Sequence, residues 1–343
     1  MPALLAGVLA LGVAPAPAHA LTCDRVASPT GSDAAAGTLA SPFRTAQRLS
    51  DSMAPGRTGC LRAGSYSQAE LRFRHAGSRG APITFTSYPG ERATLKGGFV
   101  YVPSGSDHVT ISNVDIDAAA ARQVAVQIMA ADVILQDSDI TNRNTRVCVI
   151  LGSNAGYGKS VRTTIRRNRI HNCGDPAAGN QHHAVYFENS VDAKVVDNLF
   201  WATSAFAIHL YPNAQRTLVA HNVIDTNGRG IIFAGDKSRA SSNNTVAYNL
   251  ITADSLDYAV TAWWGGPVGS GNTAHDNCLY RNTIGNVGAR KGFTAARNTV
   301  ADPRYRDAAA HDYRLARGSR CLAVVGYDTA AKLAGGPVRR RQG

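Results

Sequence analysis

Two short segments carry the residues of this sequence best suited to acid–base chemistry. HAVYFEN contains Tyr186 and Glu188, and AFAIHLY contains His209 and Tyr211. If both segments are strands, alternate side chains point the same way, so these four leave the core on one face. Histidine can remove or deliver a proton near neutral pH, and tyrosine can be its partner acid. Because aromatic faces also stack on pyranose rings, the set predicts a site for sugar chemistry.

The chemistry that fits best is β-elimination of a uronic acid polymer. That reaction needs a group that neutralises the carboxylate, a base for the C5 proton and an acid for the leaving oxygen. We assign His209 as the base and Tyr186 or Tyr211 as the acid. Arg229 or Lys237 is the expected neutralising cation. Glu188, the last of the catalytic set, is expected to orient His209 or Arg229. The expected substrate-binding residues are His182, His183, Asp236, Trp263, Trp264 and Arg146.

The element expected to hold these segments is a coil that repeats along the chain. A pattern of β-favouring residues, a polar pair, Asn and apolar residues recurs from VTISNVDI to TAARNTV. Its marked positions are Asn113, Asp137, Asn168, Asn198, Asn222, Asn249, Asn277 and Asn298, with gaps of 24, 31, 30, 24, 27, 28 and 21 residues. A period of about 20 to 50 residues indicates a solenoid. Its short Val-, Ile- and Thr-rich segments predict β-coils, in which a stacked Asn can adopt a left-handed turn and bond to its neighbours.

A second strand is expected in each coil, and the site lies on its outward face. The inward residues Val126 and Ile128, Val185 and Phe187, Ile208 and Leu210, and Ile231 and Phe233 are expected to fill the core. One outward column is expected to be Gln127, Ile150, Tyr186, His209, Ile232 and Thr261. The next is expected to be Met129, Gly152, Glu188, Tyr211, Ala234 and Trp263. Tyr186 and His209 should therefore lie one strand spacing apart, as should Glu188 and Tyr211.

The two ends of the chain carry the family resemblance. SPFRTAQRLSDSMAPG (41–56) predicts a short amphipathic helix that covers the first coil, and DPRYRDAAAHDYRLARGSRCLAVVGY is expected to close the domain. SPFRTAQRLSDSMAPGRTGCLRAGSY and DPRYRD…HDYRLARGS resemble the opening and closing segments of the pectate-lyase-like right-handed parallel β-helix proteins. With the Asn repeats, the resemblance covers about residues 23–328. It implies an all-β, single-stranded right-handed parallel β-helix with an N-terminal helical cap. It also implies a lyase, hydrolase, epimerase or non-catalytic spike.

The N-terminus and the cysteines indicate an exported protein. Residues 1–20 are apolar and end in a small-x-small site, which predicts a signal peptide, although no positive charge precedes Arg25. We expect a single domain over 21–343 with a short disordered basic tail at about 336–343. Six cysteines allow three disulfides, which we pair in chain order as Cys23–Cys60, Cys148–Cys173 and Cys278–Cys321. We therefore expect a secreted monomer with no membrane span.

The net charge of +12 favours a polyanionic partner. The chain has no recognition helix, zinc finger or aromatic–basic RNA motif, so an acidic polysaccharide is expected and nucleic acid is not. Asp115 and Asp139 fall at matching places in adjacent coils, and like charges there call for a cation or an Arg between them, so calcium is a possible cofactor. The resemblance implies that a Lys or Arg base with bound calcium is common, which makes Lys237 the alternative base.

Three other functions stay open at this point. A glycoside hydrolase of the same fold would use paired carboxylates such as Glu188 and Asp236. A C5 epimerase would share the proton abstraction of the lyase. A non-catalytic glycan-binding β-helix would tolerate replacement of Tyr186, His209 and Tyr211 without losing glycan binding.

Overall fold

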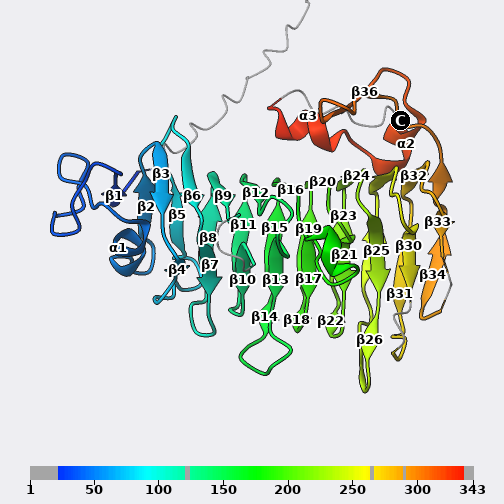
Figure 1. The fold of residues 1–343 in the computed structure, drawn as a ribbon, viewed down its shortest axis with the longest axis horizontal. Coiled ribbons are helices and arrows are strands. Elements are labelled where there is room, and N and C mark those ends of the chain that lie inside the picture. The colour runs from blue at the N-terminus through cyan, green and yellow to red at the C-terminus, as the bar shows by residue number, and fades with distance from the viewer. Residues whose placement is uncertain (1–21, 120–123, 263–265, 289–290, 336–343) are drawn as a thin grey trace, which may run out of the picture.

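The computed structural model describes residues 22–119, 124–262, 266–288 and 291–335. The signal peptide and the basic tail expected from the sequence lie outside these residues. Three long sheets of short strands run along the molecule, and every strand pair within them is parallel. Each turn of the chain adds one strand to each sheet, so the described chain is a parallel β-helix (Figure 1).

Sheet A is the first of the three sheets and carries one wall of the coil. Its strands are β1 (Arg25–Ala27), β2 (Thr58–Leu61), β5 (Ile83–Ser87), β8 (Val109–Ser112), β11 (Ile134–Gln136), β15 (Thr164–Arg166), β19 (Lys194–Val196), β23 (Leu218–Ala220), β28 (Thr245–Ala247), β31 (Asn272–His275) and β34 (Phe293–Ala296). A three-stranded sheet of β14 (Ser160–Val161), β18 (Ser190–Val191) and β22 (Ala214–Gln215) lies in the turns that lead into sheet A.

Sheet B follows sheet A after a turn of two residues in most coils, with one residue between β8 and β9 and five between β5 and β6. Its strands are β3 (Gly64–Ser67), β6 (Ala93–Lys96), β9 (Val114–Asp117), β12 (Asp139–Thr141), β16 (Arg169–His171), β20 (Leu199–Trp201), β24 (Val223–Asp225), β29 (Leu250–Thr252), β32 (Cys278–Tyr280) and β35 (Thr299–Val300). The sharpness of this turn places sheets A and B at a corner that repeats along the whole stack.

Sheet C completes each coil and corresponds to the second strand expected from the sequence. Its strands are β4 (Glu70–Arg72), β7 (Phe99–Val102), β10 (Val126–Ile128), β13 (Val149–Leu151), β17 (Val185–Phe187), β21 (Phe206–Leu210), β25 (Arg229–Phe233), β30 (Tyr258–Ala262) and β33 (Gly285–Val287). A hairpin of β26 (Gly235–Asp236) and β27 (Arg239–Ala240) projects after β25 (Figure 1). The short helix η1 (Pro176–Ala178) lies in the loop before β17.

The core is a continuous apolar column enclosed by the three sheets. All eight residues expected to face inward from sheet C belong to it: Val126, Ile128, Val185, Phe187, Ile208, Leu210, Ile231 and Phe233. Close packing of these stacked side chains stabilises the solenoid along its length.

The Asn repeat forms a hydrogen-bonded ladder, but its register differs from the prediction by one residue at the N-terminal end. Backbone pairing aligns Ser138 with Asn168 and aligns Asn113 and Asp137 with Arg167. Asn113, Asp137 and Arg167 have positive φ, so the left-handed residue is the one before the ladder position. The ladder itself runs through Asn168, Asn198, Asn222, Asn249, Asn277 and Asn298. Each of the first five donates from its backbone N–H to Oδ1 of the next Asn.

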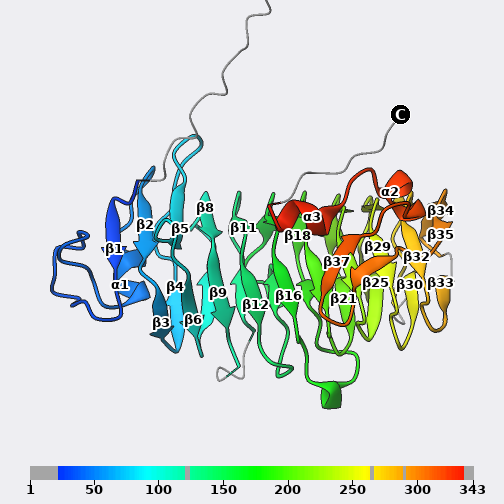
Figure 2. The ribbon, with the colours of Figure 1, turned by 90° about the horizontal axis from the view of Figure 1, so that it is seen from above.

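The two terminal segments lie in different places relative to the coils. Helix α1 (Ala46–Asp51) is shorter than the expected helix over 41–56. It lies at the N-terminal end of the stack, where Leu49 joins the core. The C-terminal segment was expected to close the domain, but it runs back along the outside of sheet B (Figure 2). It contains the hairpin β36 (Tyr305–Asp307) and β37 (Asp312–Leu315), α2 (Arg320–Val325) and α3 (Thr329–Leu333).

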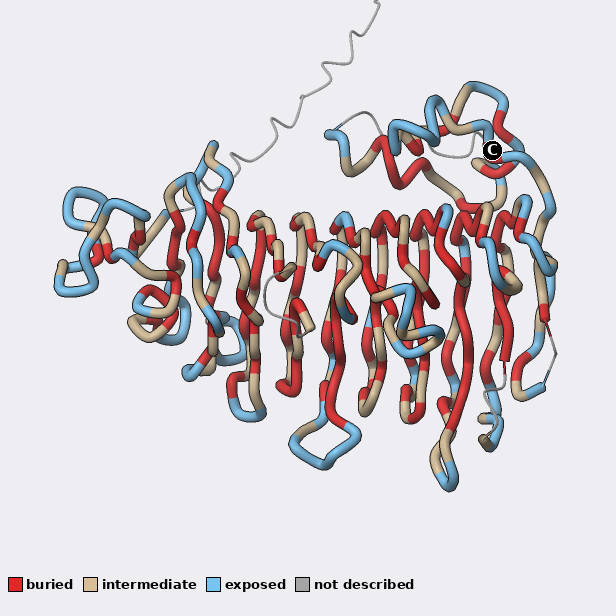
Figure 3. The backbone as a smooth tube through the Cα atoms, in the orientation of Figure 1, coloured by how far each residue is buried: buried red, intermediate tan, exposed pale blue. Residues whose placement is uncertain are grey.

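Apolar contacts and a disulfide hold the C-terminal segment on sheet B. Tyr313, Leu315 and Val325 pack on Leu199 and Trp201, and Figure 3 shows this buried seam between the segment and the coils. The disulfides join Cys23 to Cys60, Cys148 to Cys173 and Cys278 to Cys321, as expected from chain order. Such bonds fit an oxidising, extracellular compartment. None of the helices in the described parts of the chain is long and apolar enough to cross a bilayer.

Candidate functional site

The expected outward column on sheet C is present. The register pairs Gln127 with Ile150, Ile150 with Tyr186, and Tyr186 with His209. Ile232 and Thr261 continue the column. The alternation of apolar and polar residues allows only one register that keeps the apolar side chains inside. In that register β17 and β21 are neighbours and their polar faces point outward.

Aromatic rings from these two strands form one cluster. The rings of Tyr186 and Tyr211 lie parallel, with centroids 6.1 Å apart. The His209 ring lies 5.3 Å from Tyr186, 5.1 Å from Tyr211 and 5.2 Å from Phe206. Both tyrosines keep part of their surface exposed, so a ligand can contact them.

Two histidines lie beneath this aromatic surface. His209 Nδ1 and His183 Nε2 are 2.7 Å apart, so one imidazole donates a hydrogen bond to the other. Only 2% of His209 and 1% of His183 is exposed. Burial lowers the pKa of His209 to about 3, and burial together with the neighbouring His209 lowers the pKa of His183 well below its usual value. The pair is therefore neutral near pH 7, and its imidazoles support the tyrosine rings from below.

Glu188 lies at the carboxyl end of β17 and is partly buried. Its Oε2 accepts a hydrogen bond of 2.8 Å from the backbone N–H of Asn154, in the loop between β13 and β14. Burial raises the pKa of Glu188, and the Asn154 bond and the charge of Arg239 oppose the rise. Burial also raises the pKa of Tyr186, and the charge of Glu188 adds to the effect.

The β26–β27 hairpin brings Arg239 to the same surface. This cation was not among the residues expected from the sequence. Arg239 pairs with Asp236 through bonds of 2.6 and 3.1 Å. The charge of Arg239 lowers the pKa values of Tyr186 and Tyr211, against the larger effect of burial. Lys237, the expected cation, is exposed near the hairpin turn, two residues before Arg239.

Arg229, the other expected cation, is already engaged. Its Nη1 lies 3.0 Å from Asp257 Oδ2, and its guanidinium lies 5.5 Å from the centre of the Phe206 ring. Phe206 and Arg229 are register partners on β21 and β25. Both residues therefore build the wall beside His209.

The remaining expected residues lie at the margin of this cluster or away from it. His182 and Arg146 lie at the amino-terminal edge of sheet C, where burial and the Arg146 charge lower the pKa of His182. Trp263 and Trp264 lie outside the described residues. Asp115 and Asp139 are on sheet B, a different face of the coil.

The described residues do not fit a calcium site at Asp115 and Asp139. These register partners each have a basic neighbour: Arg92 lies 2.6 Å from Asp115, and His171 lies 2.9 Å from Asp139. Near the aromatic cluster on sheet C, Asp236 is paired with Arg239, and Glu188 accepts a hydrogen bond from the backbone N–H of Asn154. In the described parts of the chain, no three His, Cys, Asp or Glu side chains gather as metal ligands do.

Comparison with known families agrees with this architecture. Residues 96–300 match the family described as the right-handed β-helix region, which is more than half of the chain. The chain belongs to this family. Right-handed β-helix proteins of the pectate-lyase-like superfamily share the parallel coils and the repeat that the structure displays.

Two curated relatives match this right-handed β-helix chain over part of their length. The uncharacterized protein YwoF of Bacillus subtilis is 29% identical over 228 residues, which is 64% of this chain and 45% of YwoF. Pectate lyase PEL9 of Emericella nidulans is 35% identical over 78 residues, which is 22% of this chain and 19% of PEL9. The chain thus spans less than half of each curated relative.

Solved structures with similar coils include enzymes of more than one reaction class. Pectate lyase Pel9A has a TM-score of 0.64 at 13% identity, covering 89% of this chain and 92% of Pel9A. The GH136 lacto-N-biosidase of Eubacterium ramulus has a TM-score of 0.52 at 13% identity, covering 80% of this chain and 67% of that enzyme. At 13% identity these likenesses show the right-handed β-helix fold alone, and they do not separate lyase from hydrolase.

Proposed function

We propose that this β-helix protein is a secreted polysaccharide lyase that cleaves an acidic, uronate-containing glycan on the outer face of sheet C. One observation carries the proposal: the Tyr186 and Tyr211 rings are stacked, Arg239 acts electrostatically on both of them, and Glu188 acts on Tyr186. Aromatic faces, a carboxylate and a guanidinium are the groups that binding and β-elimination of a uronate require. The partial match to pectate lyase PEL9 and the net charge of +12 support an anionic substrate.

The roles follow from burial and charge. Arg239 binds the uronate carboxylate and stabilises the charge that builds on it when the C5 proton leaves. Glu188 takes the C5 proton, because a partly buried carboxylate with a raised pKa is a stronger base than an exposed one. Tyr186 keeps its phenolic proton, since its pKa is raised, and gives it to the leaving glycosidic oxygen.

The elimination step conserves its protons. The C5–H and C4–O bonds break, a C4=C5 double bond forms, and the proton gained by Glu188 returns to Tyr186 through solvent. His209, first assigned as the base, is buried under the rings. In this proposal His209 and His183 are positioning residues that hold the Tyr186 and Tyr211 rings.

A glycoside hydrolase is the second candidate, because a carboxyl group with a raised pKa also suits a general acid. Hydrolysis would need a second carboxylate opposite Glu188. Asp236 is the second carboxylate expected from the sequence, but it is paired with Arg239. The lyase therefore accounts for more of the observed contacts.

The test is an ultraviolet assay for unsaturated uronate ends on a panel of acidic polysaccharides. We expect activity in the wild-type protein and a loss of at least about 100-fold in kcat for Tyr186→Phe and Glu188→Gln. Tyr248→Phe, at the corner between sheets A and B, is the matched control and should keep full activity.

Three results would count against the lyase. New reducing ends without absorbance would favour the hydrolase, and inversion at C5 without cleavage would favour the epimerase. Glycan binding that survives replacement of Tyr186 and Tyr211, with no turnover, would favour a binding protein.

A further inference from the structure

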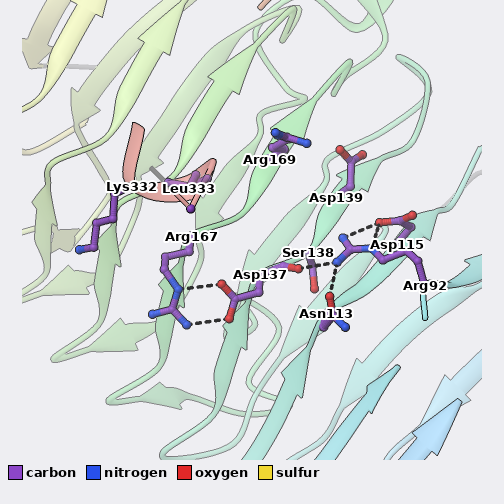
Figure 4. Close-up of a pocket in the computed structure, with 11 residues that line it drawn as sticks. Arg92, Asn113, Asp115, Asp137, Ser138, Asp139, Arg167, Arg169, Lys332 and Leu333 are labelled. Atoms are coloured by element: carbon purple, nitrogen blue, oxygen red, sulfur yellow. Dashed lines mark hydrogen bonds and ion pairs between the residues drawn. The ribbon is translucent and has the colours of Figure 1, made fainter. Parts of the chain in front are cut away.

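A polar trough lies on the outer face of sheet B, on a different face from the aromatic cluster. Its floor is one outward column in which Asp115 pairs in register with Asp139, and Asp139 with Arg169. The cavity has a volume of about 500 Å³ and is bordered by Lys332 and Leu333 of α3 (Figure 4). None of the expected catalytic residues lines it.

The trough begins where the C-terminal segment stops covering sheet B. In the following coils the same column continues as Leu199, Val223, Leu250 and Cys278. The C-terminal segment packs on these apolar residues and buries them. The outward column of sheet B thus changes from charged to apolar residues at the point where α3 ends. The C-terminal segment covers the apolar residues and leaves the charged ones uncovered.

Most of the cations that line the trough are held by carboxylates. Arg167 makes bonds of 2.7 and 2.6 Å to Asp137, and Arg92 binds both Asp115 and the Asn113 side chain at 2.6 Å. These pairs are drawn as dashed lines in Figure 4. Lys332 binds Asp197 at 2.7 Å, beside the trough.

Arg169 differs from the other cations. It is exposed on β16 and makes no ion pair with any described residue. Its register neighbour Asp139 is held by His171 at 2.9 Å, and Figure 4 shows Arg169 beside Asp139 without a bond between them. A guanidinium with free donors is well suited to a planar carboxylate, which it can bind through two hydrogen bonds.

The neighbouring acceptors suit sugar hydroxyl groups. Asp115 and Asp139 are register partners on neighbouring strands, whose backbones lie about 4.8 Å apart. Each carboxylate can accept several hydrogen bonds, so its partner cation does not exhaust it. A volume of this size lies in the range of about 300 to 1,000 Å³ that small-molecule sites occupy.

From these contacts we infer that the sheet B trough is a second, non-catalytic binding site for a carboxylate-bearing sugar unit, with Arg169 binding the carboxylate and Asp139 and Asp115 accepting from ring hydroxyls. The inference concerns binding only. It stands apart from the chemistry proposed on sheet C, and a uronate glycan would be held on two faces of the coil.

Calorimetric titration tests this site with hexamers of galacturonate and of mannuronate. The titration uses the protein carrying Arg239→Gln, so that binding at sheet C is weakened. We expect the remaining binding to fall about tenfold or more when Arg169→Gln is added, which is the effect of losing one charge-assisted contact. Arg216→Gln is the matched control: Arg216 is an exposed arginine paired with Asp192 near sheet A, and its loss should leave the affinity unchanged.

Several outcomes would overturn the inference. They are an equal loss with Arg216→Gln, an unchanged affinity with Arg169→Gln, and the absence of Arg169-dependent binding by either hexamer. Equal binding of neutral maltohexaose, or displacement of the hexamer by an equal concentration of inorganic sulfate, would also remove the sugar acid as the ligand. Failure of the lyase assay with Arg169-dependent binding intact would reject the proposed function and leave this site standing.

Discussion

His209 Nδ1 lies 2.7 Å from His183 Nε2, and both imidazoles are buried beneath the tyrosines of the candidate site. His183 comes from the residues just before β17, and His209 from β21, so the contact joins two successive coils. Because desolvation disfavours the charged form, the folded protein holds both histidines neutral. The arrangement of the Tyr186 and Tyr211 rings therefore depends on the protonation state of the two histidines beneath them.

The histidine pair should make the protein lose stability in acid. A histidine whose pKa is lowered on folding contributes its full stabilisation above the unfolded value of about 6.5, and that contribution falls as pH drops toward the folded pKa. We expect His209→Gln to flatten the pH dependence of the unfolding free energy by about 1.4 kcal/mol per pH unit below pH 6. Denaturant unfolding at several pH values measures this slope. His75→Gln, at an exposed site, should leave it unchanged, and equal slopes for all three proteins would contradict a neutral buried pair.

Asp254 occupies an asparagine position in a second ladder, between sheets B and C. Its Oδ1 accepts from the backbone N–H of Asn227, and its own N–H donates to Asn282 Oδ1. Asn227 and Asn282 use their Nδ2 groups to donate to carbonyl oxygens of the preceding coil. Asp254 has an oxygen in place of that donor, so it fits the ladder best when it is protonated. Burial raises its pKa in the same sense.

Replacing Asp254 by Asn should stabilise the protein at neutral pH. A carboxyl group whose pKa is raised on folding is favourable below its unfolded value of about 3.9, and that advantage is lost as pH rises. We expect Asp254→Asn to raise the unfolding free energy by about 1 to 3 kcal/mol at pH 7 and by much less at pH 4. The reciprocal change Asn282→Asp should destabilise at pH 7. A destabilised Asp254→Asn protein at pH 7 would show that the carboxylate is needed as such.

The main ladder should depend on its middle rungs more than on its last one. Asn222 Nδ2 donates to Val195 O, Ala220 O and Asn249 Oδ1, and its Oδ1 accepts from Asn198. Since Asn222 is buried, Asn222→Ala leaves several polar groups without partners and should cost at least about 3 kcal/mol. Asn298→Ala removes the last rung, where water can replace the side chain, and should cost less. Thermal unfolding compares the two, and equal losses would contradict a ladder whose strength comes from burial.

The sequence allowed the coils, the core and the outward column of sheet C to be predicted, because their side chains alternate with a period of two. Val185 and Phe187 point inward and Tyr186 outward for this reason. The ladder register was wrong by one residue at Asn113 and Asp137, because a polar residue also favours the left-handed position just before the rung.

The site was harder to predict than the coils, because loops and burial shape it. Period-two alternation places His209 outward, but it does not reveal that Phe206, Tyr186 and Tyr211 cover the ring. The alternation of side chains also does not distinguish Lys237 from Arg239 as the cation of the site. The geometry of the hairpin decides this, because it brings Arg239 close enough to act electrostatically on the tyrosines. The path of the C-terminal segment was missed for a similar reason: the apolar outward residues of sheet B, such as Leu199 and Val223, were not recognised as its binding surface.

The last prediction separates the two cations of the β26–β27 hairpin. Arg239 is fixed by Asp236 and acts electrostatically on Tyr186 and Tyr211, whereas Lys237 is exposed near the hairpin turn. If Arg239 binds the uronate carboxylate in the ground state and more strongly as charge builds, Arg239→Gln should raise KM and lower kcat, with a loss of about 100-fold or more in kcat/KM. Lys237→Gln changes the same net charge and should alter kcat/KM less than about threefold.

Steady-state kinetics on an acidic glycan, repeated at low and high salt, makes this comparison. Long-range attraction of a polyanion would make both variants lose activity alike and would make the loss disappear as salt screens the charges. A specific contact at Arg239 predicts a loss that persists at high salt and that Arg239→Lys repairs only in part, because lysine cannot form the two-pronged contact. Equal effects of the two glutamine variants would therefore remove Arg239 from the site and leave the carboxylate-binding role without a residue on this hairpin.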